Sequence, residues 1–430
     1  MNSSWVTYLK SGAWGVSENL AYPLLMLIAT PIYLSLLGEV QYGQWMLVAT
    51  FVSMGGLSGG GMGASATKDV SAHRGKNDLT SAKASVQAAL FVSISISCLM
   101  SFLMILLLYI DLSSLFALIG DSAQITAIVT FSVILIILEQ IDTVFVGTIK
   151  GMERYDVAAK IEIIFKTLIV VSTIITAYLY SDIQKVLLVL TILIFFRLIV
   201  KAIAAARLLG VKILLPKWDG NFVKKSFDFG RWSWFQSIGG IIFSVGDRLI
   251  IGSILGPEAL TRYSIALQLA QQIHTIPSAA MNFIFPLISR KIKKNGNNHD
   301  SIKRLSYNLI KINIIISLLI SMPIIIFSYE ILSLWVGTEI ANTTSFVMSV
   351  LAVGYLILSL NVAPHFVLLG LNVARFVSLS NIVGGVITLI LSIFFTPVYG
   401  LIGAAISRTM YGVVVNSNLI ILKNKLNKGV

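Results

Sequence analysis

Charged residues inside apolar stretches are the groups in this sequence whose types and spacing could do chemistry. Glu139 and Asp142 are three residues apart, so on a helix their carboxylates share one face. Asp247 and Arg248 are adjacent, so on a helix they point in different directions and need separate partners. An ionised side chain at the centre of a bilayer costs about 2.5–3.5 kcal/mol on insertion scales. We therefore expect each such group to face an opposite charge or a water-filled cavity.

The residues alone leave two roles open for these charges. In a structural role, acids and bases pair between helices and hold a bundle together. In a functional role, the cations line a cavity for an anionic headgroup, and a carboxylate takes up a proton. The candidate anion-binding cations are Lys166, Arg197, Arg248 and Arg408, and the candidate ion-coupling or pairing carboxylates are Glu18, Glu139, Asp142 and Asp247.

Catalytic and metal-binding motifs give little support for other chemistry. The G-x-S-x-G pattern at 56–60 continues as a glycine run to Gly63, which is more typical of close helix packing than of a nucleophile. Neither a nucleotide-binding G-x-x-x-x-G-K-[ST] motif nor H-E-x-x-H occurs. Cys98 is the only cysteine, so no disulfide can form within the chain. We expect no catalytic residue, no metal and no cofactor.

The elements that hold the charges are apolar stretches long enough to cross a bilayer, which needs roughly 20 residues. Hydrophobic residues make up 56% of the chain and charged residues only 12%. Long apolar runs such as 310–327 do not alternate with polar residues, which favours helices over a barrel. The sequence therefore predicts an all-α integral membrane protein with about 12 spans. The predicted spans are 12–37, 43–67, 84–109, 122–148, 157–180, 186–209, 230–255, 262–289, 306–334, 341–369, 373–396 and 399–422.

The basic residues predict the orientation of the spans. The formal net charge is +13, and most of the 32 Lys and Arg residues, Lys201 among them, fall on one side when sorted by loop. Cytoplasmic loops carry such an excess, so both termini are predicted to be cytoplasmic. Basic loops without interleaved aromatic residues favour attraction to anionic lipid over nucleic-acid binding.

A long basic connection after the sixth span predicts two six-helix lobes. The predicted division is an N-terminal lobe at 1–210, a cytoplasmic linker at 211–229 and a C-terminal lobe at 230–430. A faint repeat supports it, because the first and seventh spans both end in Leu-Gly with a tyrosine following. Leu-Gly also ends many unrelated helices, since glycine tolerates the left-handed cap.

Four motifs spread over the chain resemble those of the bacterial polysaccharide-biosynthesis flippases, especially the O-antigen type. That family lies in the superfamily of multidrug and oligosaccharidyl-lipid exporters. The matching segments are LGEVQYGQW at 37–45, GTIKGMERY at 147–155, DRLIIGSILG at 247–256 and PVYGLIGAA at 397–405. One departure is the second span, where the family often has Asp with Gly and this chain has only the glycine run.

The resemblance implies two lobes around a central cavity in the bacterial inner (cytoplasmic) membrane. The implied function is a flippase that moves undecaprenyl-diphosphate-linked oligosaccharide to the periplasmic leaflet by alternating access. Arg248 is the one candidate cation within a family motif. A polysaccharide polymerase and a chain-length regulator are candidate partners.

Two other functions stay open. A polysaccharide polymerase or ligase has similar hydropathy, although such enzymes carry a large outer loop and the outer loops here are short. A multidrug exporter of the same superfamily would favour acidic residues in its cavity, and the mixed charges here do not decide the question.

Overall fold

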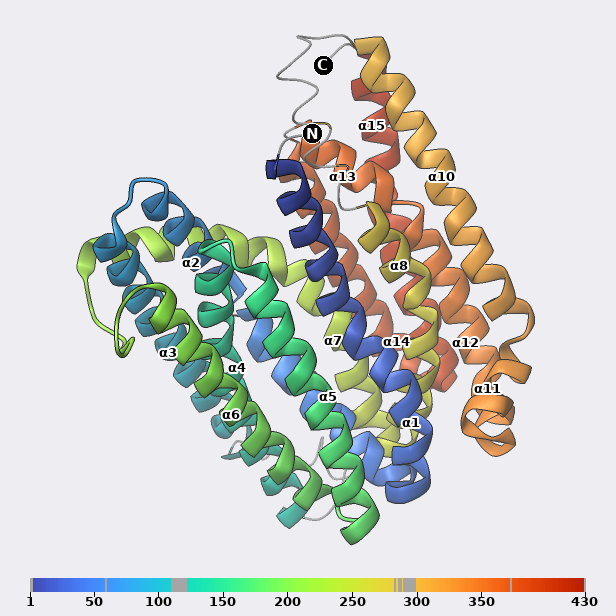
Figure 1. The fold of residues 1–430 in the computed structure, drawn as a ribbon. Coiled ribbons are helices and arrows are strands. Elements are labelled where there is room, and N and C mark those ends of the chain that lie inside the picture. Colours follow the sequence, from blue (N-terminus) through green and yellow to red (C-terminus); the bar gives the residue numbers. More distant parts are fainter. Residues whose placement is uncertain are drawn as a thin grey trace. The chain divides into compact units, whose positions relative to one another are not determined.

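A computed structural model of the protein describes residues 3–58, 60–109, 122–281, 284, 288, 299–371 and 373–428. These residues are helical, joined by short turns and one extended connection (Figure 1). The expectation of an all-α membrane protein is therefore confirmed. The chain forms two compact units, Met1–Ile238 and Gly239–Val430, which are described separately below. The lobe and linker boundaries predicted from the sequence stay a prediction.

The described residues of the first unit form six helices and the start of a seventh. Its centre is built by α4, which packs against α1, α2, α3 and α6, while α5 packs against both α1 and α6. The helices are α1 (Ser3–Ser58), α2 (Gly60–Arg74), α3 (Leu79–Tyr109), α4 (Ser122–Gly151), α5 (Tyr155–Tyr180), α6 (Ile183–Leu208) and α7 (Gly220–Ala270), the last of which continues into the second unit.

The second unit is organised around α12, which packs against α8, α10, α11 and α14. The helices are α8 (Gln272–Met281), α10 (His299–Ile326), α11 (Ser328–Val336), α12 (Thr338–Ser359), α13 (Val362–Gly370), α14 (Ala374–Val415) and α15 (Ser417–Lys428). Many large apolar side chains on these helices are exposed, as expected for surfaces that face lipid.

Three long helices are each broken by one glycine. Gly38 in α1 has φ 74° and ψ 172°, and Gly256 in α7 has φ 84° and ψ 179°. Gly400 breaks α14 at φ 58° and ψ −139°. Positive φ with ψ near 180° is a region that is essentially restricted to glycine. The two Leu-Gly ends seen in the sequence are therefore matching breaks in the backbone, one in each unit.

Eight segments of the described residues are long and apolar enough to cross a membrane. The helices α3, α4, α5 and α6 agree with predicted spans to within a few residues. Two of the eight, Tyr22–Ser53 and Arg375–Asn427, each include most or part of two predicted spans and contain a glycine break. Parts of the seventh and eighth predicted spans lie outside the fully described residues. The predicted number of about 12 spans therefore stays a prediction.

A seam of small residues joins α2 to α4. Thr67 Oγ1 donates to the Gly147 carbonyl at 3.1 Å, and Ser71 Oγ donates to the Gly151 carbonyl at 3.2 Å. A Cβ placed on Gly147 would lie 2.2 Å from the carbonyl oxygen of Gly63. Backbones in membrane bundles approach this closely only where small residues line the contact. Gly63, at the end of the glycine run, therefore serves the packing of α2 against α4.

Candidate functional site

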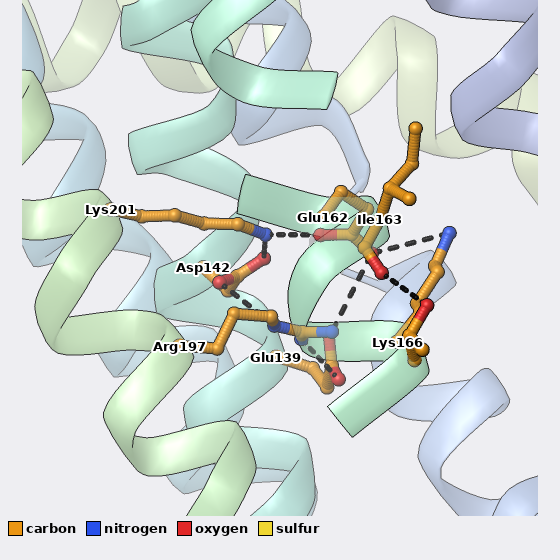
Figure 2. A network of polar contacts seen from close by, with 8 residues as sticks. Glu139, Asp142, Glu162, Ile163, Lys166, Arg197 and Lys201 are labelled. Atoms are coloured by element: carbon orange, nitrogen blue, oxygen red, sulfur yellow. Dashed lines mark hydrogen bonds and ion pairs between the residues drawn. The ribbon is translucent and has the colours of Figure 1, made fainter. Parts of the chain in front are cut away.

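One cluster of charges lies in the first unit, where α4, α5 and α6 meet (Figure 2). Each helix contributes two charged side chains to it, spaced three or four residues apart and so on one face. The cluster, here called the charge network, consists of Glu139 and Asp142 from α4, Glu162 and Lys166 from α5, and Arg197 and Lys201 from α6. Its carboxylates and cations are equal in number, so the network is formally neutral.

Lys201 lies at the closed end of the charge network. Its Nζ is 2.6 Å from Asp142 Oδ2 and 2.6 Å from Glu162 Oε2, and its side chain is only 1% exposed. The sequence counted Lys201 among the basic residues of the cytoplasmic side, and the structure shows that its side chain is buried against α4 and α5. A buried ammonium persists there because two carboxylates satisfy it.

Arg197 lies at the centre of the charge network. Its Nη2 donates to Glu139 Oε1 at 2.6 Å, and its Nε and Nη1 lie 3.5 Å from Asp142 and Glu162. The guanidinium therefore touches all three carboxylates of the network. Glu139 and Asp142 share one face of α4, as expected, and both carboxylates contact Arg197.

The other end of the network is more accessible. The Glu139 side chain is 26% exposed, and Lys166 is 19% exposed. Lys166 Nζ lies 3.3 Å from Glu162 and 6.0 Å from the ring centre of Tyr22 on α1. Within this cluster, Glu139 and Lys166 are therefore the groups that an ion or a substrate could reach first.

A second cluster of charges lies in the second unit. Arg408 Nη1 donates to Asp247 Oδ2 at 2.5 Å and to the Phe243 carbonyl at 2.9 Å. Its Nε and Nη2 both donate to Tyr355 Oη, at 3.1 and 2.8 Å. Tyr263, which follows the Gly256 break, donates from Oη to the same carboxylate oxygen of Asp247. Asp247 and Arg408 are both buried, so this pair is part of the core of the unit.

Aromatic rings enclose the Arg408 guanidinium. Its Cζ is 4.1 Å from the ring centre of Phe243, and Tyr411 stacks on Phe243 at 3.8 Å. The cavity that Arg408 and Tyr355 help to line has a volume of about 10 Å³. That volume holds about one water molecule, so a headgroup does not fit beside Arg408 in this conformation.

Arg248 differs from its neighbour Asp247. Its backbone N–H donates to Asp247 Oδ1 at 2.9 Å, but its buried Nε has no hydrogen-bond acceptor within the described part of the chain. Its side chain is partly exposed. Among the described residues, the Arg248 guanidinium forms no ion pair with a carboxylate, whereas those of Arg197 and Arg408 both do.

Sequence reasoning missed Glu162, Lys201, Tyr263 and Tyr355. Spacing could have found two of them, since Glu162 is four residues before Lys166 and Lys201 is four residues after Arg197. The side chain of Glu18 lies outside the described residues. In the part of the chain that the structure describes, no group of three or more His, Cys, Asp or Glu side chains could hold a metal ion.

Comparison with known proteins gives two family matches. The family described as polysaccharide biosynthesis protein matches residues 8–292, and the MatE family matches residues 234–397. Neighbouring solved structures share the fold. One is an inward-facing multidrug resistance MATE family transporter of the MOP superfamily, 14% identical, with a TM-score of 0.74 over 96% of this chain and 98% of that chain. Another is a MOP superfamily transporter from Pyrococcus furiosus, 14% identical, with a TM-score of 0.66 over 98% and 95%.

Two curated proteins are similar over part of the chain. A putative O-antigen transporter of Shigella flexneri is 27% identical over 188 residues, which are 43% of each chain. A probable low-salt glycan biosynthesis flippase, Agl15, of Haloferax volcanii is 26% identical over 196 residues, which are 46% of this chain and 41% of that protein. The chain thus spans less than half the length of the curated relatives it matches. The curated relatives are named as a transporter and a flippase rather than as enzymes, and the match over residues 8–292 shows that this multi-pass membrane protein belongs to the polysaccharide biosynthesis protein family.

Proposed function

We propose that this protein is a flippase for undecaprenyl-diphosphate-linked oligosaccharide repeat units of O-antigen or a related surface polysaccharide. It moves them from the cytoplasmic to the periplasmic leaflet of the bacterial inner membrane. The similarity to a putative O-antigen transporter and to a probable glycan biosynthesis flippase supports the class of substrate. The MATE-like fold supports alternating access.

The proposed architecture has twelve spans in two six-helix lobes around a central cavity, with both termini cytoplasmic. The glycine breaks at Gly38 and Gly400 support this number, because each divides one long apolar segment into two helices. The solved MATE-like structures match nearly the whole chain, which supports the same arrangement. A polysaccharide polymerase and a chain-length regulator are the proposed partners.

The observation that carries the proposal is the guanidinium of Arg248, whose buried Nε has no acceptor and which forms no ion pair among the described residues. An intramembrane cation without a carboxylate partner is stable only where it reaches water or an anionic ligand. A guanidinium binds two phosphate oxygens at once, which suits a diphosphate. Lys166, at the accessible end of the charge network, is the second proposed contact. Arg197 and Arg408 stay candidate contacts for the diphosphate, but each would first have to break its ion pair with a carboxylate.

Proton or ion coupling is proposed at the accessible carboxylate of the charge network. Glu139 is the most exposed acid of the network, and it holds Arg197 through a 2.6 Å hydrogen bond. Neutralising Glu139 would remove one of the three carboxylates that hold this cation. Asp142 and Asp247 are buried in pairs with cations, which favours a structural role for them.

The experiment is a deletion strain complemented with wild-type protein, Arg248→Gln or Arg375→Gln. Arg375 is an exposed cation at the start of α14 and serves as the matched control. Single lipid-linked repeat units are probed with a membrane-impermeant sugar reagent before and after lysis. The proposal predicts units hidden until lysis in the deletion strain and with Arg248→Gln, and normal polysaccharide with the control.

Other results would point to another function. Units that are exposed on intact cells but never joined would indicate a polymerase. Normal surface polysaccharide together with new drug sensitivity would indicate a multidrug exporter. Normal export by Arg248→Gln at normal expression would remove the diphosphate role of Arg248.

A further inference from the structure

The extended connection between α6 and α7 is held against the first unit. We define residues 211–218 as the linker strap. Gln87 of α3 forms two hydrogen bonds with the strap. Gln87 Nε2 donates to the Leu215 carbonyl at 3.0 Å, and Lys217 N donates to the Gln87 carbonyl at 3.2 Å. Leu214 is buried in the same hydrophobic cluster as Val86 and Leu90 of α3. The strap is therefore a fixed part of this unit.

The outer side of the strap is apolar. Ile213, Leu215 and Trp218 are 67%, 63% and 64% exposed. The Trp218 ring lies edge-on against Phe91 of α3, with ring centres 5.1 Å apart. Three large apolar side chains on eight residues of extended chain are costly to leave in water, at roughly 25 cal/mol per Å².

The exposed charges around the strap are positive. Lys212 and Lys217 lie within it, and Arg207 lies in the last turn of α6 just before it; all three are exposed. The acidic residue that follows, Asp219, is only partly exposed. Aromatic residues and basic side chains together are typical of a membrane interface, where the ring lies at headgroup level and the cations meet anionic lipid.

The strap also runs beside the apolar segments of two helices. The apolar segment of α6 ends at Leu208, and that of α3 begins at Leu79. The strap contacts Gln87 and Phe91, which lie about 12 and 18 Å along α3 from Leu79 at about 1.5 Å per residue. It therefore runs beside a part of α3 that belongs to the apolar segment, and not beyond the end of the helix.

We infer that the linker strap is a lipid-binding surface that lies in the cytoplasmic interface and binds anionic headgroups. Ile213, Leu215 and Trp218 enter the acyl boundary, and Lys212 and Lys217 bind phosphate groups of the lipid. This role does not depend on which substrate the protein moves. It makes the attachment of the strap sensitive to the lipid composition of the membrane.

The test places a fluorescent NBD probe on the strap in reconstituted protein. In a Cys98→Ser background, the probe is attached at Ile213→Cys, and the matched control probe at Lys76→Cys in the exposed turn between α2 and α3. Vesicles of phosphatidylcholine are compared with vesicles that also contain phosphatidylglycerol. Brominated lipids report contact with acyl chains.

We expect the Ile213→Cys probe to emit at shorter wavelength than the control and to be quenched by brominated lipid. Quenching should increase with phosphatidylglycerol and fall with salt. Each of Lys212→Gln and Lys217→Gln should reduce the dependence on anionic lipid, since one basic residue changes surface partitioning by about fivefold at low salt.

Three results would overturn all or part of the inference. Water-like emission from the Ile213→Cys probe, equal to that of the Lys76→Cys control, would show that the strap is not in lipid. Shielding of the probe in native membranes but not in pure lipid vesicles would show that another protein covers the strap. Quenching that changes with neither phosphatidylglycerol nor salt would overturn the binding of anionic headgroups by Lys212 and Lys217.

Discussion

Asp247 pairs with the guanidinium of Arg408 and not with that of its own neighbour Arg248. The Asp247 carboxylate accepts from Arg408 Nη1 at 2.5 Å, while its contact with Arg248 is through the backbone N–H of that residue. The two adjacent charges thus have different roles. Asp247 closes a buried ion pair in the core of the second unit, and Arg248 keeps a guanidinium that forms no ion pair among the described residues.

The Asp247–Arg408 pair should be a strong determinant of stability. Asp247→Asn leaves the Arg408 guanidinium buried with only neutral acceptors, so we expect unfolding to be easier by about 3–5 kcal/mol. Glu258→Gln, on an exposed residue of the same helix, should change stability by less than about 0.5 kcal/mol. The measurement is thermal unfolding of detergent-purified protein.

A double variant separates a lost ion pair from lost packing. Asp247→Leu combined with Arg408→Met removes both charges, so it should recover much of the stability that each single change loses. Additive losses in the double variant, or a wild-type unfolding temperature for Asp247→Asn, would contradict the pairing.

Lys201→Met should destabilise the first unit. The change leaves Asp142 and Glu162 without the ammonium that lies 2.6 Å from each, and we expect a loss of about 3–5 kcal/mol. Lys160→Met, at an exposed position of α5, should cost no more than about 1 kcal/mol. Equal unfolding temperatures for the two variants, measured in the same detergent, would exclude a central role for Lys201.

Gly147→Ala should disrupt the seam between α2 and α4. The new Cβ would lie 2.2 Å from the Gly63 carbonyl oxygen, so the helices must separate, at a cost of about 1–3 kcal/mol or more. Gly75→Ala is the matched control, because its Cβ would meet nothing closer than 3.5 Å. The comparison of folded yield by size-exclusion chromatography should show a loss for Gly147→Ala alone.

Gly38→Ala tests backbone strain without a steric clash. No heavy atom lies within 4 Å of a Cβ at this position, so any cost comes from φ 74° and ψ 172°. We expect about 1–3 kcal/mol, and no rescue by Asn, because this region differs from the left-handed helical one that Asn tolerates. An unchanged unfolding temperature would show that α1 can adopt another break.

The sequence predicted the helices of this fold well because long apolar runs have few alternatives in a membrane. The ends of α5 and α6 lie within about three residues of the predicted spans, a usual margin for helix ends. The shared face of Glu139 and Asp142 also followed from spacing alone. Their common partner Arg197 did not, since contacts between α4 and α6 depend on how the bundle packs.

Burial of charged side chains is the feature of the candidate site that the sequence did not show. Lys201 falls near a predicted cytoplasmic end, where a lysine side chain usually reaches the surface. The structure instead turns it toward Asp142 and Glu162. The sequence proposed the same anion-binding role for Arg408 and Arg248, and the structure distinguishes them through the contacts of Arg408 with Asp247 and Tyr355.

The most direct measurement uses purified protein in vesicles that contain an undecaprenyl-diphosphate-linked oligosaccharide in both leaflets. A membrane-impermeant glycosidase reports which oligosaccharides face outward. With wild-type protein, and with the Arg375→Gln control, we expect the inner pool to become accessible. With Arg248→Gln it should stay protected although the protein is folded. An inner pool that stays protected with wild-type protein and an imposed ion gradient would contradict the flippase function, and an inner pool released equally by Arg248→Gln would contradict the role of Arg248.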